Sequence, residues 1–263
     1  MLPHATTLLP DLLARRRRSG RMLVALDFDG TLSPIVPRPG DAALLDGIET
    51  SLRRLASRPD TVVAIVSGRG LADVRERVGL DRLYYAGNHG FEIEGPGIDR
   101  VHPAAARARP ALESCMDGVG RALADESGTE VEDKRWTLSV HYRMADREGA
   151  EERVRAAVRE HCDRPGLRVT EGKKIFEIRP DVDWHKGRAT AFLLDTVAEG
   201  EAEPLPAVFI GDDRTDEDAF EVVRERGGGI VVGDPPPAET RAIAWLRGPA
   251  EVADMIRAMA EEA

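Results

Sequence analysis

Two carboxylates directly follow an apolar run near the start of the chain. Asp27 and Asp29 come after residues 22–26, and Gly30 and Thr31 come next. Residues two apart on an extended chain project to the same side, so both carboxylates can address one atom or ion. The apolar run suits a strand that is buried on both faces of a parallel sheet. A turn without chemistry explains the same short motif, so the hypothesis of a reactive site depends on the rest of the chain.

Two further apolar runs end in polar residues: Ser67-Gly68-Arg69 after residues 61–66, and Gly211-Asp212-Asp213 after residues 207–210. In open α/β sheets ligands bind beyond the carboxyl ends of the strands, which is where all three groups are expected. If the first and last of these strands are neighbours, four carboxylates converge on one small volume: Asp27, Asp29, Asp212 and Asp213. Like charges at that distance raise one another's pKa, and a hard divalent cation offsets them. Oxygen-only ligands favour Mg²⁺ over zinc or copper, so the sequence predicts a magnesium site.

The reaction class follows from the groups around the expected ion. Asp27 can attack phosphorus and form an aspartyl phosphate, which divides a difficult displacement into two easier steps. Asp29 can protonate the leaving alcohol and then deprotonate water in the second step. The hydroxyls of Thr31 and Ser67 can hydrogen-bond the phosphoryl oxygens, and Lys186 can offset their charge. Together these residues predict phosphoryl transfer.

The order of the expected elements gives the architecture that must position these residues. The expected strands are at 22–26, 61–66, 83–86, 207–210, 229–232 and 243–246, and the expected helices at 41–56, 71–78, 186–198 and 250–259. Their alternation predicts an α/β fold with a right-handed, doubly wound, mostly parallel sheet.

Between His102 and Trp184 the pattern changes. The expected elements there are helices at 111–125 and 148–161, a strand at 135–143 and further strands within 167–179. In 135–143 apolar and polar residues alternate, so one face packs on helices and the other looks outward. On the same grounds Lys173 and Glu177 share the outward face of the last strand. The pattern predicts an α+β cap, a helix-strand-strand unit repeated once, over residues 105–181, inserted into a core formed by residues 1–104 and 182–263.

The composition limits the classes of partner. The chain has 263 residues, 37 of them basic and 47 acidic, a net charge of -10 and 5% aromatic residues. This argues against a nucleic-acid surface, which needs positive charge and stacking rings. Cys115 and Cys162 are too few for a disulfide framework and are expected as small core residues. No apolar stretch has signal-peptide or membrane length, so we expect a soluble cytoplasmic monomer without a membrane partner, with Arg15–Arg18 as a solvated flank of the first helix.

The ordered motifs resemble those of the haloacid dehalogenase-like (HAD-like) phosphohydrolases. They are DFDGT (Asp27 to Thr31), Ser67-Gly68-Arg69, Lys186-Gly187 and GDDRTDED (Gly211 to Asp218). Three further segments are similar to signatures of the trehalose-6-phosphate phosphatases within that superfamily: GNHG (Gly87 to Gly90), HYR (His141 to Arg143) and GKKIFEIRP (Gly172 to Pro180). The resemblance covers residues 23–259 and implies a Rossmannoid core with a C2-type cap.

The resemblance also implies roles for individual positions. Asp27 would be the nucleophile and Asp29 the general acid/base. The implied Mg²⁺ ligands are Asp27, the main-chain carbonyl of Asp29, and Asp212, with Asp213 in support. The implied phosphoryl-binding residues are Ser67 and Lys186.

The implied sugar-binding positions are Arg143, Lys173 and Glu177 in the cap and Asn88 at its boundary with the core. The alternation of the cap strands places Arg143, Lys173 and Glu177 on the outward face independently of the resemblance. Arg69 could contact phosphate, but a salt bridge at a helix start is the favoured expectation. Asp216 is expected to cap the helix after its strand or to support the metal.

The activity that the resemblance implies is hydrolysis of trehalose 6-phosphate to trehalose and phosphate, in trehalose biosynthesis. A second hypothesis keeps the chemistry and changes the substrate: a sucrose-phosphate or mannosyl-phosphoglycerate phosphatase, or a phosphosugar mutase. A third is a catalytically silent binding or regulatory module on the same fold. The third is disfavoured because a silent copy has no need to keep Asp27, Asp29, Lys186 and Asp212 together.

Overall fold

The computed structural model describes residues 2–201 and 203–261. It divides into two compact units, which we call the core unit (Met1–Arg100 and Trp184–Ala263) and the inserted unit (Val101–Asp183). The insertion expected from the sequence, residues 105–181, lies inside the second of these. Among the described residues the structure has no helix with the length and apolar character needed to cross a membrane.

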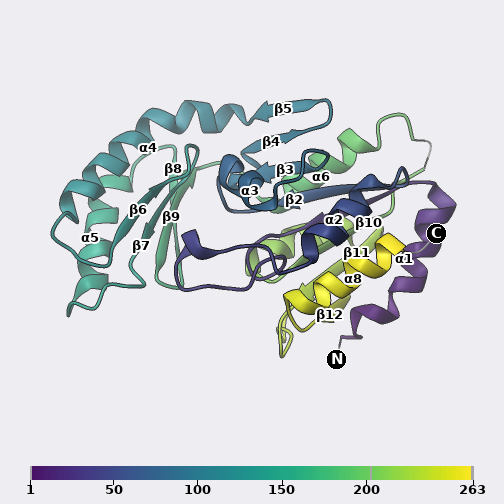
Figure 1. The fold of residues 1–263 in the computed structure, drawn as a ribbon. Coiled ribbons are helices and arrows are strands. Elements are labelled where there is room, and N and C mark those ends of the chain that lie inside the picture. Colours follow the sequence, from purple (N-terminus) through teal and green to yellow (C-terminus); the bar gives the residue numbers. More distant parts are fainter. Residues whose placement is uncertain (1, 202, 262–263) are drawn as a thin grey trace. The chain divides into compact units, whose positions relative to one another are not determined.

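The core unit is built on one eight-stranded sheet (Figure 1). The strand order is β12-β11-β10-β1-β2-β3-β4-β5; the pairs from β12 to β3 are parallel, and β4 runs antiparallel to β3. The strands are β1 Met22–Leu26, β2 Thr61–Val66, β3 Tyr84–Gly87, β4 Glu92–Gly95, β5 Ile98–Val101, β10 Ala207–Gly211, β11 Gly227–Val232 and β12 Ala244–Leu246. The predicted doubly wound, mostly parallel sheet is confirmed.

Helices cover both faces of this sheet. One face packs on α1 (Leu9–Ser19), α2 (Ile48–Ser57), α3 (Leu71–Val78) and α8 (Pro249–Glu261), and the other on α6 (Lys186–Val197) and α7 (Glu217–Val223). Every residue of β1 is fully buried, with Val24 in the first of these apolar clusters and Ala25 in the second. The unbroken apolar run of β1 is therefore explained by burial on both faces.

Two local expectations for the core unit are wrong. The helix expected from Asp41 begins only at Ile48, because the chain before it is held as a loop: the N–H of Leu45 donates to the carbonyl of Leu32 at 2.9 Å, and Gly47 has φ +81°. Arg16, expected in a solvated flank, is fully buried and donates from Nη1 to the carbonyl of Met259 at 2.7 Å. It joins α1 to α8.

The inserted unit is a four-stranded antiparallel sheet covered by two helices (Figure 1). The strand order is β6-β7-β9-β8. Its elements are α4 Pro103–Ala122, β6 Glu130–Asp133, β7 Leu138–His141, α5 Ala150–Cys162, β8 Leu167–Gly172 and β9 Ile175–Pro180. The predicted α+β insertion is confirmed, and β6 is a strand whose position the sequence pattern did not predict.

Helix α4 and the cysteines differ from expectation. The helix begins at Pro103, well before residue 111, because His102 caps it by accepting from the N–H of Ala104 at 3.2 Å, and Pro110 is accommodated inside it. Cys115 and Cys162 are fully buried, as expected of core residues, but they are joined in a disulfide between α4 and α5. The expectation of two separate core side chains is therefore wrong.

Candidate active site

The first carboxylate of the site stands at the exit of β1. The backbone N–H of Asp27 donates to the carbonyl of Ile210 on β10 at 2.9 Å, and the parallel register pairs Leu26 with Ile210. Asp212 follows β10 as Asp27 follows β1, so the two carboxylates leave neighbouring strands at the same edge of the sheet. Asp27 is only 4% exposed. The expected adjacency of the two strands is confirmed.

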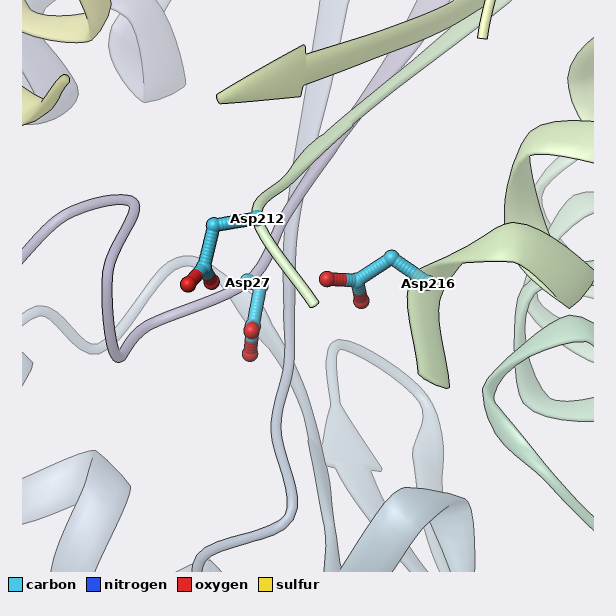
Figure 2. Close-up of side chains that lie close together, drawn as sticks. All are labelled: Asp27, Asp212 and Asp216. Atoms are coloured by element: carbon cyan, nitrogen blue, oxygen red, sulfur yellow. The ribbon is translucent and has the colours of Figure 1, made fainter. Parts of the chain in front are cut away.

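A third carboxylate, Asp216, completes a cluster with Asp27 and Asp212. One oxygen from each of the three lies within 4.8 Å of the others. Figure 2 shows the three side chains grouped together, with the carboxylate of Asp216 directed toward Asp27. Across residues 2–201 and 203–261 no other trio of acidic, histidine or cysteine side chains comes close enough to share an ion.

Asp213 was expected in this cluster, and Asp216 takes its place. The side chain of Asp213 is exposed and accepts from the N–H of Arg214 at 2.7 Å. Asp216 accepts from the N–H of Asp213 at 3.0 Å, so the two form a capping box around the 3₁₀ turn Arg214–Asp216. The cluster thus keeps two of the four expected carboxylates, Asp27 and Asp212, and adds Asp216. A supporting role for Asp213 stays a prediction.

Lys186 binds two of the three carboxylates. It opens helix α6, its side chain is 2% exposed, and its Nζ lies 2.9 Å from Asp27 Oδ2 and 2.8 Å from Asp216 Oδ1. Burial alone would lower the pKa of Lys186, but the charges of Asp216 and Asp27 and their hydrogen bonds raise it above its ordinary value. Lys186 is therefore a fixed ammonium that orients Asp27.

One ammonium does not balance the three carboxylates of the cluster, of which Asp27 and Asp216 are buried and Asp212 is half-buried. Burial raises the pKa of Asp27 well above its ordinary value, although the charge of Lys186 opposes this. Burial raises the pKa of Asp212 to about 7, and the charge of Asp216 adds to the effect. Burial also raises the pKa of Asp216. This excess of negative charge is typical of a site built for a divalent cation.

Two features beside Asp212 fit such a cation. Gly30 has φ +75°, and a Cβ at this position would overlap the carboxylate of Asp212. The close approach of the loop after β1 to that carboxylate therefore requires glycine at position 30. The Oδ1 atom of Asp212 is buried and, in the part of the chain that the structure describes, has no hydrogen-bond partner. A buried carboxylate oxygen without a donor is costly unless a cation meets it. A donor set of oxygens alone suits a hard divalent ion.

The two hydroxyls expected at the site lie on loops at this edge of the sheet. Ser67 follows β2, the other neighbour of β1, is 1% exposed and accepts from the N–H of Arg69 at 3.2 Å. Thr31 is fully buried, and its Oγ1 has no hydrogen-bond partner among residues 2–201 and 203–261. Contact of either hydroxyl with a phosphoryl group stays a prediction.

Asn88 belongs to a loop that braces the loop of Ser67. Its backbone N–H donates to the carbonyl of Arg69 at 2.6 Å, and the N–H of His89 donates to the carbonyl of Ser67 at 2.8 Å. The Asn88 side chain is fully buried and donates to Glu92 Oε2 at 3.1 Å. In the structure Asn88 holds this loop in place, and its contact with a sugar stays a prediction.

The side chain of Asp29 is not part of the cluster of Asp27, Asp212 and Asp216. It is 38% exposed, and both of its oxygens accept hydrogen bonds from Arg69 at 2.7 Å. The expected salt bridge of Arg69 at a helix start is also present, to Asp73 at 2.8 Å. An exposed carboxylate in a fixed pose suits proton transfer better than metal ligation by its side chain.

Glu177 lies at the centre of a polar row in the inserted unit. On β9 it pairs with Ser139 of β7, and Ser139 pairs with Glu132 of β6, so the three side chains share one face of the sheet. Lys134 adds a cation, since its Nζ lies 3.8 Å from Glu177 Oε1 and 3.9 Å from Glu132 Oε2. Such a row of charged groups and a hydroxyl is suited to binding a polyhydroxylated ligand.

Arg143 and Lys173 lie in turns beside this sheet. Strand β7 ends at His141, and Lys173 falls in the two-residue turn between β8 and β9. Both side chains are exposed. Their expected places on strand faces are wrong because the strands are shorter than the alternating sequence pattern. For Glu177 the pattern is right, since its neighbour Phe176 is buried in the apolar cluster on the other face.

Comparison with known protein families matches residues 25–238 to the family described as trehalose-phosphatase. The chain belongs to the trehalose-phosphatase family. It is 44% identical over 242 residues to the trehalose-phosphate phosphatase of Mycobacterium tuberculosis, covering 91% of this chain and 61% of that protein. It is 39% identical over 259 residues to the probable trehalose-phosphate phosphatase 4 of Oryza sativa, covering 95% of this chain and 68% of that one.

Solved structures carry the same fold. The trehalose-6-phosphate phosphatase C-terminal domain of Candida albicans superposes with a TM-score of 0.79 at 26% identity, over 100% of this chain and 99% of that one. The C-terminal domain of the trehalose synthase regulatory protein of Candida albicans has a TM-score of 0.72 at 15% identity, over 98% and 99%. The chain spans about three fifths of the length of the Mycobacterium tuberculosis relative.

Sequence analysis left Asp216 between a helix cap and support of the metal, and the structure places it both in a capping box and in the carboxylate cluster. Two contacts were not expected. Lys134, in the polar row of the inserted unit, lies just beyond a strand that carries no apolar pattern. Arg69 was expected in a salt bridge, but its pairing with Asp29 joins residues forty positions apart. No local signal reports such a pairing.

Proposed function

We propose that this chain hydrolyses trehalose 6-phosphate to trehalose and inorganic phosphate through an aspartyl-phosphate intermediate on Asp27. The observation that carries the chemistry is the buried carboxylate of Asp27, held by Lys186 at 2.9 Å beside Asp212. Family membership and the activity for which the relatives are named support the choice of substrate.

In the first step an oxygen of Asp27 attacks phosphorus. Lys186 binds Oδ2 of Asp27, which holds the carboxylate in one orientation and lowers the cost of bringing a phosphate beside it. Asp29 donates a proton to the departing sugar oxygen. The hydroxyls of Ser67 and Thr31 hold the phosphoryl oxygens.

In the second step water attacks the phosphoryl group on Asp27. Asp29, which has given up its proton, now accepts one from this water, so the same side chain serves as acid and then as base. Release of phosphate restores the carboxylate of Asp27. Because Asp27 is buried, bulk water has little access to the intermediate, and the attacking water is the one that Asp29 deprotonates.

We further propose Mg²⁺ as the cation of the site. Asp27 and Asp212 would hold it, with the main-chain carbonyl of Asp29 as the resemblance implies, and Asp216 would support them through Lys186. When bound, the ion offsets the negative charge of the carboxylates and of the phosphoryl group. The orphaned Oδ1 of Asp212 is the structural support for this assignment.

The sugar is assigned to the polar row of the inserted unit. Glu177, with Lys134 and Glu132 beside it, offers donors and acceptors for several hydroxyls at once. Arg143 and Lys173, exposed in the neighbouring turns, add cations that can donate hydrogen bonds to sugar hydroxyls. Specificity for a disaccharide phosphate would then come from this unit and the chemistry from the core unit.

A phosphate-release screen tests the proposal. Trehalose 6-phosphate should be hydrolysed in preference to glucose 6-phosphate, sucrose phosphate and mannosyl-phosphoglycerate, and Asp27→Asn should remove turnover. Preference for another phosphosugar would change the substrate assignment and leave the proposed phosphoryl-transfer mechanism in place. A product that is an isomeric phosphosugar would indicate a mutase, and an inactive chain that still binds the sugar would indicate a regulatory module. Turnover retained by Asp27→Asn would rule out this nucleophile.

A metal-binding measurement tests the cofactor separately from turnover. Calorimetric titration of the chelator-treated chain with Mg²⁺ should show one site, and Asp212→Asn should abolish it. Asp195→Asn, an exposed carboxylate on α6, is the control and should leave binding unchanged. Equal Mg²⁺ binding by the wild-type chain and Asp212→Asn would contradict the assignment.

A further inference from the structure

Asp29, the proposed general acid/base, stands on a loop with its side chain 38% exposed. A single guanidinium engages both of its oxygens: Arg69 Nε donates to Oδ2 and Nη2 donates to Oδ1, each at 2.7 Å. Two parallel hydrogen bonds fix the plane of a carboxylate as well as its position. A lysine ammonium in the same place is a point charge and would leave that plane free to turn.

Arg69 is itself held from several sides. Its Nη1 donates to Asp73 on α3 at 2.8 Å, and its Nη2 also donates to the carbonyl of Pro39 at 2.9 Å. The guanidinium lies over the ring of Phe28, 5.3 Å from its centroid. Only 9% of the side chain is exposed. A side chain bonded and packed in this way has one conformation, so it gives Asp29 a fixed reference.

We propose that Arg69 is a positioning residue that aims the proton of Asp29 at the oxygen of the departing sugar. This inference rests on the proposed function. As an oxygen of Asp27 forms its bond to phosphorus, the bond from phosphorus to the sugar oxygen breaks and leaves its electron pair on that oxygen, and Asp29 gives that oxygen its proton. An alkoxide is a poor leaving group, so the proton must arrive in line as the bond breaks. Arg69 acts through Asp29 and leaves the phosphoryl group to other residues.

The leaving group separates this role from two others. p-Nitrophenolate departs without a proton, so the first step with p-nitrophenyl phosphate does not need Asp29. If Arg69 bound the phosphoryl group directly, its loss would slow both substrates alike. If Arg69 only stabilised the fold, its loss would change the melting temperature and the active fraction, again without regard to the leaving group.

The experiment measures the first turnover by rapid quench, with enzyme and Mg²⁺ in excess over substrate. Arg69→Gln should slow release of trehalose from trehalose 6-phosphate by about 100-fold, the usual size of a misplaced general acid, and change release of p-nitrophenolate by less than about threefold. Arg69→Lys should restore only part of the rate, because lysine keeps the positive charge but cannot make the two parallel hydrogen bonds of the guanidinium. Arg75→Gln is the matched control: Arg75 lies on α3, close in sequence to Arg69, but pairs with Glu94, and both rates should stay unchanged.

A second comparison shows whether Arg69 acts through Asp29. In an Asp29→Asn background, Arg69→Gln should slow the first turnover of trehalose 6-phosphate no further. Further slowing in that background, or equal slowing of both substrates in the single variant, would overturn the proposal. If circular dichroism shows that Arg69→Gln does not fold, Asp73→Asn takes its place, since it removes an anchor of Arg69 without touching Asp29 and should slow only the sugar substrate.

Failure of the proposed function would look different. A wild-type chain that releases p-nitrophenolate but no phosphate from trehalose 6-phosphate would count against the substrate assignment. The same set of variants would then be run on the alkyl phosphate that the substrate screen identifies. Slower release of the alkyl leaving group alone in Arg69→Gln would support the role of Arg69, and equal slowing of alkyl and aryl release would overturn it.

Discussion

The metal-free chain should lose stability as the pH rises from about 4 to about 7. In the folded chain the pKa of Asp212 is about 7, raised from 3.8 chiefly by burial. Between these values the folded state holds a proton on Asp212 that the unfolded state has released. Since the folded state then binds more protons than the unfolded state, the free energy of unfolding falls with rising pH.

The size of the effect follows from the two pKa values. A span from 3.8 to about 7, at about 1.4 kcal/mol for each pH unit, gives up to about 4 kcal/mol for Asp212. Asp212→Asn removes this titration and leaves an amide of similar shape. The variant should therefore equal the wild-type chain near pH 4 and exceed it by up to about 4 kcal/mol at pH 8. Below pH 4 the two curves should run parallel.

Urea unfolding in EDTA at a series of pH values measures the difference. A Trp136→Phe background silences the tryptophan of the inserted unit, so fluorescence reports Trp184 and Trp245, which both belong to the core unit. Added Mg²⁺ should stabilise the wild-type chain at pH 8 and leave Asp212→Asn unchanged. Asp195→Asn, with its exposed carboxylate, is the matched control and should follow the wild-type curve. A difference between wild type and Asp212→Asn that does not vary with pH would refute the reasoning.

Three other substitutions test separate parts of the structure. Cys115→Ala/Cys162→Ala should lower the free energy of unfolding of the inserted unit by about 4 kcal/mol, the chain-entropy value for a separation of 47 residues, as measured by urea unfolding; a loss below about 1 kcal/mol would contradict that value. Gly30→Ala should abolish calorimetric Mg²⁺ binding, because its Cβ overlaps the Asp212 carboxylate, and unchanged binding would show that the loop can yield. Glu177→Ala should raise KM for trehalose 6-phosphate about tenfold or more while p-nitrophenyl phosphate hydrolysis persists; equal loss of both activities would exclude a role confined to the sugar.

The parts of the site that the sequence predicted are those governed by local pattern. An apolar run that ends in a carboxylate can be recognised in the sequence. In a parallel sheet the carboxyl ends of neighbouring strands lie at the same edge, so the residues that follow these runs lie close together. Asp27 and Asp212 were expected together for this reason, and the register of β1 and β10 places them so. Glu177 was expected on the polar face because Phe176 and Ile178 alternate with it, and both are buried.

The parts that escaped prediction depend on tertiary contacts. The pairing of Arg69 with Asp29 requires two loops from different strands to meet, which no periodicity reports. Asp216 is drawn into the cluster by Lys186, whose own position depends on where α6 packs. Strand β6 carries acidic residues and is stabilised by its pairing with β7, so its sequence lacks the apolar alternation of a typical strand.

The net charge of the carboxylate cluster and Lys186 bears on the order in which cation and substrate bind. When ionised, Asp27, Asp212 and Asp216 carry three negative charges against the single positive charge of Lys186, and the chain as a whole carries -10. A phosphate monoester brings close to two more negative charges into this buried volume, where Coulomb repulsion is strong. A divalent cation cancels the two negative charges in excess before the substrate arrives. On the proposed function the cation should therefore bind first and the phosphosugar second, because the three carboxylates would otherwise repel the phosphate of the substrate.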